Sequence, residues 1–280
     1  MLRSLEHFDE YQMAYYEELR EYFSDRTYLL DGLQKFLEKA VAECEFCVRF
    51  EMRHLPNVYQ DRAIRQLAEV GGGVTFGGLD RRKKVLHCLF NCRIKEMEAA
   101  DYPVFGYLTK PHNGYELLFN ADMAYQYGSV LCVLKKENMM DRTTMTFGDS
   151  VNFGACLRMV ATRVNKILPT CFQSIGNANS NGEARIMAPP TPFWYIVNLY
   201  RAIEAGKIDL DRLDRLPDLF DGRAGCEFIE LQYHGGIRID RDIKEMYGME
   251  WDEGDAEIMK EYFPKIEELG IHTAVVDYGL

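Results

Sequence analysis

The sequence has no long apolar run. None of its 280 residues belong to a stretch near the roughly 20 apolar residues that a membrane-spanning helix needs. Residues 1–10 contain several acids and no apolar segment, which is not the pattern of a secretory signal. The sequence therefore predicts that the protein has no membrane partner. It also predicts a cytoplasmic location, or export by a route that uses no cleavable signal.

Basic residues are in the minority. The chain has 33 Lys and Arg against 44 Asp and Glu, which gives a formal net charge of −11. Binding to nucleic acid depends largely on clustered Lys and Arg that meet the phosphates. The one dense basic run, residues 81–84, is more typical of a solvated helix start. We therefore expect no nucleic-acid partner.

Paired histidines at metal-ligand spacing are also missing, and no catalytic metal site is expected. Eight cysteines in a long chain without a signal are best interpreted as reduced thiols. Cys44 and Cys47, with Cys88 and Cys92, have spacings that could suit zinc, yet both pairs lie in apolar, periodic segments. Buried free cysteine is common in protein cores. Whether these four thiols bind metal stays open at this point.

The composition, 47% hydrophobic and 28% charged, is that of an ordinary globular protein. Residues 5–43 have helical periodicity with a break expected at Asp31-Gly32, and further helices are expected at 57–70, 80–99, 153–168, 192–206, 241–247 and 254–269. Strands are expected at 47–54, 104–109, 128–136, 142–147, 226–234 and 272–278. These patterns predict a helical N-terminal extension, residues 1–45, and a single α+β domain of mixed strands, residues 46–280.

One expected strand carries a notable set of polar side chains. Residues 226–236 alternate apolar and polar, so Glu230, Gln232 and His234 share one face. A carboxylate at a strand end can stabilise a developing cation or act as a base, and an adjacent amide and imidazole can tune it. Glu230 is therefore the first catalytic candidate. The alternative is an edge strand whose polar face lies in water.

A second group of candidates begins at Arg142. This residue heads a strand rich in threonine, including Thr144 and Thr146, and a guanidinium beside hydroxyls suits a pyrophosphate or carboxylate ligand. An exposed ion pair of Arg142 with Asp141 or Asp149 is the alternative. Asp149 and Ser150 follow directly. Ser150 could be a nucleophile, or the two residues could cap the next helix and line a polar pocket.

The order and spacing of these segments resemble an uncharacterised bacterial family, the domain of unknown function numbered 3626. The likeness is carried by residues 102–108, 127–130, 142–150 and 229–235, and it spans about residues 50–250. The layout of that family looks like that of ADP-ribosyltransferases, which have an early Arg, a hydroxyl-bearing strand and a late Glu. The resemblance implies a mixed, mostly antiparallel β core and NAD as a substrate.

On that resemblance, Glu230 would be the catalytic acid that stabilises an oxocarbenium-like ribose, and Gln232 would help to orient the acceptor. The pocket would be supported by Ser129, which follows Gly128, or by the row containing Thr144. Three arginines are candidates for holding the NAD phosphates, namely Arg49, Arg53 and Arg142.

The resulting hypothesis is an NAD-dependent ADP-ribosyltransferase or NAD-glycohydrolase, of the kind found in toxins and effectors, acting on a protein or other macromolecule. Two other classes stay open. One is a serine hydrolase that uses Ser150. The other is a non-enzymatic binding module, whose acidic surface would meet a basic partner.

Overall fold

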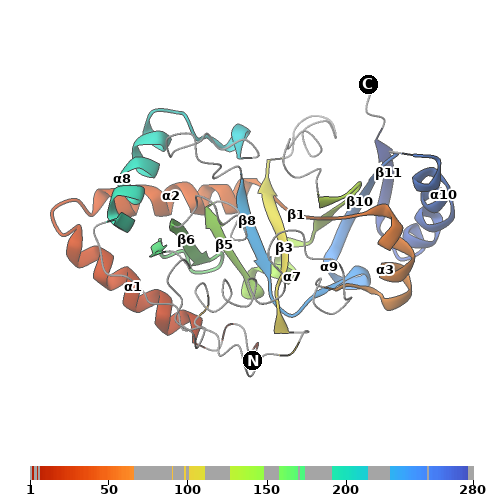
Figure 1. Ribbon diagram of the computed structural model, residues 1–280, viewed down its shortest axis with the longest axis horizontal. Coiled ribbons are helices and arrows are strands. Elements are labelled where there is room, and N and C mark those ends of the chain that lie inside the picture. The colour runs from red at the N-terminus through yellow and green to blue at the C-terminus, as the bar shows by residue number, and fades with distance from the viewer. Residues whose placement is uncertain are drawn as a thin grey trace.

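A computed structural model of the chain contains one large β-sheet flanked by helices (Figure 1). The structure describes Leu2, Leu5, Phe90 and Glu98 and residues 7–65, 101–110, 127–147, 158–169, 171–173, 191–213, 228–250 and 252–276. Within these residues, no helix is both long enough and apolar enough to cross a bilayer.

The strands of the large sheet are β1 (Glu45–Phe50), β3 (Val104–Thr109), β4 (Val130–Leu134), β5 (Thr143–Phe147), β6 (Arg158–Arg163), β7 (Cys171–Gln173), β8 (Ile229–Tyr233), β10 (Ile243–Met249) and β11 (His272–Val276). They lie in the order β11-β10-β4-β1-β3-β8-β5-β6-β7, and β2 (Ala63–Ile64) pairs with β9 (Ile237–Arg238) in a separate ribbon. The pair β10–β11 is parallel, and the other paired neighbours are antiparallel. The expected mixed, mostly antiparallel α+β architecture is confirmed.

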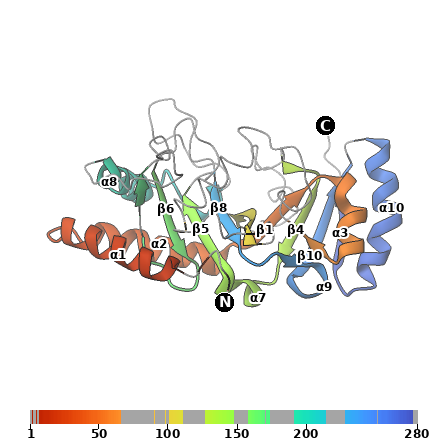
Figure 2. The ribbon, with the colours of Figure 1, turned by 60° about the horizontal axis from the view of Figure 1, so that its bottom comes forward.

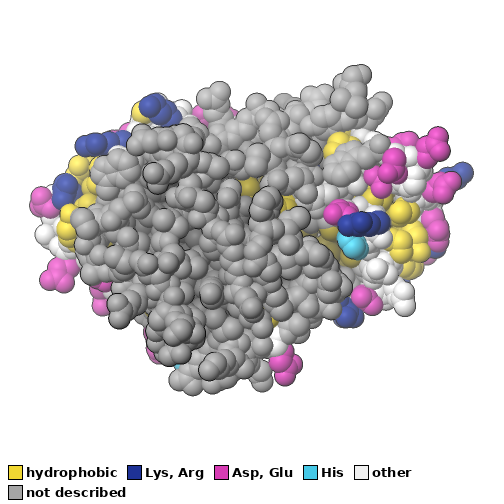
Figure 3. Space-filling model, in the orientation of Figure 1, with side chains coloured by type: hydrophobic (Ala, Val, Ile, Leu, Met, Phe, Trp, Pro, Cys, Tyr) yellow, Lys and Arg dark blue, Asp and Glu magenta, His cyan; other side chains and the backbone are white. Residues whose placement is uncertain are grey.

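The described helices lie along one side of this sheet and at its ends. They are α1 (Phe8–Tyr22), α2 (Tyr28–Glu43), α3 (Leu55–Asp61), α7 (Lys136–Met139), α8 (Thr191–Glu204), α9 (Ile239–Asp242) and α10 (Glu253–Glu267), with short 3-10 turns η2 (Met52–His54), η6 (Met140–Arg142) and η8 (Leu210–Arg212). Helices α1 and α2 run along one side of the strands, and α3 and α10 lie together at the β11 end (Figure 2). Acidic side chains gather at that end of the molecular surface (Figure 3).

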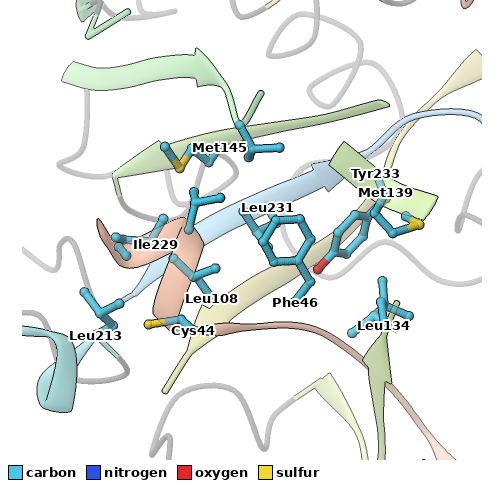
Figure 4. Packing of buried hydrophobic residues seen from close by; sticks show 14 of the residues in the cluster. Cys44, Phe46, Leu108, Leu134, Met139, Met145, Leu213, Ile229, Leu231 and Tyr233 are labelled. Carbon is cyan, nitrogen blue, oxygen red and sulfur yellow. The ribbon is translucent and has the colours of Figure 1, made fainter. Parts of the chain in front are cut away.

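The main core lies between α2 and one face of the sheet, which we call the helix-covered face. Leu33 and Leu37 of α2 join Phe46, Leu108 and Leu231 in one buried cluster, part of which is shown in Figure 4. Because α2 contributes directly to this core, the boundary expected at residue 45 does not coincide with a break in the packing. Removing large apolar side chains from water is the dominant favourable contribution to such packing.

The opposite face of the sheet carries a second, smaller cluster. Its buried members include Cys47, Tyr107, Leu131 and Tyr247, which come from four neighbouring strands. In a strand, successive side chains point to opposite faces. The alternation in these strands therefore builds two separate layers, and Glu230 lies on this second face, because it is register partner to Tyr107.

Several sequence expectations for single elements are confirmed. The strand expected at 104–109 is β3, and the apolar strand expected at 128–136 is β4, buried at every position. The helices expected at 192–206 and 254–269 are α8 and α10. The helix expected at 80–99 lies outside the described residues, apart from Phe90 and Glu98.

The break expected at Asp31-Gly32 is wrong. Gly32 lies inside α2, and the chain instead turns between Tyr22 and Tyr28. A Cβ at position 32 would come within 2.3 Å of the Tyr200 ring of α8. The glycine therefore permits close helix packing and does not end the helix.

Two other expected helices are strands in part. Residues 158–163, expected within a helix, form β6, and residues 243–249 form β10. Each segment pairs with an existing strand, β5 and β4 respectively, and pairing within a sheet overrides local periodicity. The helix expected at 57–70 is α3, which ends at Asp61 because Arg62 adopts a left-handed φ of 53°.

One glycine is required at the centre of the sheet. The Tyr233 ring crosses the helix-covered face at Gly106, and the Tyr233 hydroxyl donates a hydrogen bond of 3.1 Å to the carbonyl of Cys47. A Cβ at position 106 would lie 2.1 Å from that carbonyl oxygen and 2.6 Å from the ring. No side chain fits between Tyr233 and the β1 backbone.

We predict that Gly106→Ala lowers the free energy of unfolding by about 2 kcal/mol or more, because overpacking forces the Tyr233 ring or the backbone to move. Urea denaturation followed by circular dichroism measures the loss. Gly254→Ala at the start of α10 is the control, and it should change stability by less than about 1 kcal/mol. Equal effects of the two substitutions would contradict this packing account.

Candidate functional site

Strand β8 is placed at the centre of the sheet, between β3 and β5. In the β5–β8 register, Thr146 faces Glu230 and Thr144 faces Gln232. On the other side, Tyr107 of β3 faces Glu230. Directly opposed residues share a face, so the candidates Glu230, Gln232 and Thr144 lie together.

Hydrogen bonds join these side chains into one chain. Gln232 Nε2 donates to Glu230 Oε1 at 2.7 Å and to Thr146 Oγ1 at 3.0 Å. Thr144 Oγ1 donates to Gln232 Oε1 at 2.8 Å and lies 3.0 Å from His234 Nε2. We call these five residues the polar row.

The polar row is buried. Glu230 is 3% exposed and Gln232 and His234 are 0% exposed. The alternative of an edge strand with its polar face in water is therefore wrong for β8. A buried polar group is costly without a hydrogen-bond partner, so the register of β5 on β8 is tied to the pairing of these side chains.

His234 ends the row in an apolar and cationic setting. Its ring meets the Phe90 ring edge-on, with centroids 4.8 Å apart. Burial, helped by the positive charges of Arg163 and Arg142, lowers the pKa of His234 to about 3. The imidazole is therefore neutral at ordinary pH and can act as a hydrogen-bond partner, not as a charge.

Arg142 lies beside the polar row, but its guanidinium contacts the turn that follows β8. Its guanidinium donates to Asp242 Oδ2 at 2.6 Å, to the His234 carbonyl at 3.2 Å and to the Gly236 carbonyl. Gly235 and Gly236 have φ values of 78° and 71°, which favour glycine. Arg142 thus holds the turn that follows β8, and the partner of its ion pair is Asp242.

Asp242 is the centre of this arrangement, and its side chain is fully buried. Burial would raise its pKa, but hydrogen bonds from Arg241, from the Arg238 backbone N–H and from Arg142 outweigh burial and hold the pKa below its usual range. The carboxylate stabilises the fold above the pKa of the unfolded chain. That contribution is lost as the pH falls through the lower folded-state pKa.

Arg49 lies on the same face as Glu230, two strands away along the order β8-β3-β1. Its side chain is buried, and its Nε donates to the Tyr107 hydroxyl at 3.0 Å. Tyr107 therefore stands between the Arg49 guanidinium and the strand that carries Glu230. Arg53, the other early candidate, lies in η2 and is paired with Glu51 at an exposed position.

Ser129 and Gly128 lie elsewhere in the fold. The Ser129 hydroxyl donates to Asp255 of α10 at 3.3 Å, at the start of β4. Gly128 has a φ of 130°, and a Cβ there would lie 2.1 Å from the Phe50 backbone. The structure does not bring these two residues into the polar row. Asp149 and Ser150 lie outside the described residues.

Of the four cysteines whose metal binding stayed open, the two described ones are separated. Cys44 belongs to the main core and Cys47 to the cluster on the opposite face. Burial raises the pKa of Cys44 to about 12 and that of Cys47 well above its usual value, which disfavours the thiolate that binds metal. Cys88 and Cys92 lie outside the described residues, and in the part of the chain that is described no three potential ligands cluster.

Comparisons with known proteins add no assignment. The chain matches no family model, and no curated protein is similar to it.

Two residues of the site are absent from the sequence-based candidates, namely Tyr107 and Arg163. The alternation of β3 places Tyr107 on a definite face, but only the β3–β8 register brings it to Glu230. Arg163 lies on β6, a segment whose periodicity predicts a helix, and is the register partner of Thr144 on β5. Chemically, the row presents one carboxylate held by an amide, inside a setting where water is scarce and electrostatic interactions are strong.

We predict that His234→Gln makes the protein less sensitive to acid. In the wild type, the unfolded chain binds a proton at this histidine below about pH 6.5, whereas the folded protein does not until about pH 3. Stability should therefore fall with decreasing pH in that window, by up to about 1.4 kcal/mol per pH unit from this group. Urea titrations from pH 7 to pH 4 measure the slope. An unchanged slope in the variant would contradict a buried neutral His234.

We predict that Asp242→Asn lowers the free energy of unfolding by about 3–5 kcal/mol at pH 7, because it replaces the fully buried carboxylate that pairs with the partly buried Arg142 cation. Asp240→Asn is the matched control, since Asp240 is half exposed and pairs with Arg238 at the surface. The control should stay within about 0.5 kcal/mol of the wild type. Similar losses in both variants would show that Asp242 is not the anchor of this region.

Proposed function

We propose that the protein cleaves the nicotinamide–ribose bond of NAD, as an ADP-ribosyltransferase or NAD-glycohydrolase, with Glu230 as the catalytic carboxylate. The observation that carries the proposal is the hydrogen bond of 2.7 Å from Gln232 to Glu230 on a buried strand face. Loss of nicotinamide develops positive charge on the ribose. A carboxylate fixed in a water-poor setting stabilises such a charge far better than one in water.

Arg49 is the best-placed arginine for the NAD phosphates. It shares the face of Glu230, and it is held by Tyr107, the register partner of Glu230. A guanidinium matches phosphate oxygens in a planar, two-point contact. Arg142 is less suitable, because its guanidinium is used by Asp242 and by three backbone carbonyls.

The remaining row residues would act on the carboxylate and on the pocket. Gln232 holds Glu230, and Thr146 and Thr144 hold the two ends of the Gln232 amide. This division of roles supports Gln232 as a positioning residue first. Its proposed contact with an acceptor rests on the family resemblance alone. No described residue favours the serine hydrolase alternative.

We predict that Glu230→Gln reduces NAD cleavage by at least about 100-fold, because the amide cannot neutralise the developing cation. The assay is release of nicotinamide from labelled NAD, with and without candidate protein acceptors. Glu245→Gln is the matched control, since Glu245 lies on strand β10 and accepts from Lys244 and Tyr247. It should keep near wild-type activity.

Absence of nicotinamide release by the wild-type protein across several acceptors would contradict the proposal and would favour a binding module. Equal loss in the Glu230 and Glu245 variants would assign the effect to folding.

A further inference from the structure

The hydrogen bonds of the polar row have a direction. Thr144 has one hydroxyl proton, and that proton goes to Gln232 Oε1 at 2.8 Å. The contact of 3.0 Å between Thr144 and His234 Nε2 must then use a proton on the imidazole. His234 is therefore the Nε2–H tautomer, and every bond of the chain His234→Thr144→Gln232→Glu230 donates toward the carboxylate.

The opposite tautomer of His234 would reverse the direction of every hydrogen bond in this chain. If His234 Nε2 accepted the Thr144 proton, the Gln232 amide would have to turn and donate to Thr144. Its oxygen would then face Glu230 at 2.7 Å. Two oxygens at that separation require a proton between them, so Glu230 would be a neutral acid. The tautomer of His234 and the charge of Glu230 are thus linked through three hydrogen bonds.

We propose that His234 is a positioning residue that sets the orientation of the Gln232 amide through Thr144, and so presents Glu230 as a fixed carboxylate. The proposal rests on the proposed function, because Glu230 is the reacting group there. His234 does this without touching Glu230. A neutral donor suffices, which agrees with an imidazole buried against Phe90.

The direct test is NMR on the full-length protein, with nitrogen-15 in the histidine rings and in the glutamine amides. The wild type should show the Nε2–H tautomer at His234 and slow exchange of the Gln232 amide protons. Thr144→Val removes the link and should speed that exchange about tenfold, the factor expected for loss of one hydrogen bond. Thr143→Val is the matched control, because Thr143 lies on the same strand and its hydroxyl donates to the Met139 carbonyl, not to a member of the polar row. Its effect on Gln232 should be small.

Activity provides the second comparison. His234→Phe should lower kcat by up to about 100-fold with little change in KM, because a misplaced carboxylate is poorly aligned with the ribose. His234→Gln, which keeps a donor near the Nε2 position, should restore most of it. If His234→Phe fails to fold, Thr144→Val takes its place, and this variant should also lower kcat with little change in KM.

An Nδ1–H tautomer, or an unchanged Gln232 exchange rate in Thr144→Val, would overturn the inference. If the wild type does not cleave NAD, the proposed function fails, while the NMR comparison still decides whether His234 orients Gln232.

Discussion

The hydrogen bond between Gln232 and Glu230 is the interaction on which the rest of the site depends. A carboxylate that is 3% exposed in the middle of a sheet is costly unless strong partners surround it. Gln232 supplies a donor on the same strand, and β5 supplies two threonines that fix the amide. Because a shift of one residue would turn this face toward the apolar core, the polar row also specifies the register of β5 on β8.

The C-terminal end of β8 is held by two different physical means. On the helix-covered face, the Tyr233 ring fills the space that Gly106 leaves and ties β8 to β1 across β3. After the strand, Arg142 closes the Gly235-Gly236 turn, and its partly buried guanidinium pairs with the fully buried Asp242. Packing therefore fixes the strand, and charge fixes the turn. His234, the last member of the polar row, lies directly between these two anchors, and the rest of the row runs back along β8 from them.

Much of the architecture could be predicted from the sequence, because β3, β4, β8 and α10 have strong patterns of their own. The sharing of one face by Glu230, Gln232 and His234 also follows from simple alternation. The burial of that face does not, since an alternating strand looks the same at an edge and at the centre of a sheet. Strands β6 and β10 were hidden because their order comes from pairing with β5 and β4.

The role of Arg142 illustrates the same limit. Its position at the head of a threonine-rich strand is typical of a ligand-binding arginine, but its partner Asp242 is 100 residues away in sequence. Long-range pairings of this kind cannot be inferred from one sequence. Arg49, by contrast, shares a face with Glu230 only because β3 lies between β1 and β8.

The central claim is that the Glu230 carboxylate is the group that meets the ribose of NAD. A crystal structure of the Glu230→Gln variant with NAD tests it most directly, because this substitution should stop the reaction and preserve the shape of the site. The account predicts the nicotinamide ribose within about 3.5 Å of residue 230, with the phosphates toward Arg49. NAD bound away from β8, or an empty face at millimolar NAD, would contradict it.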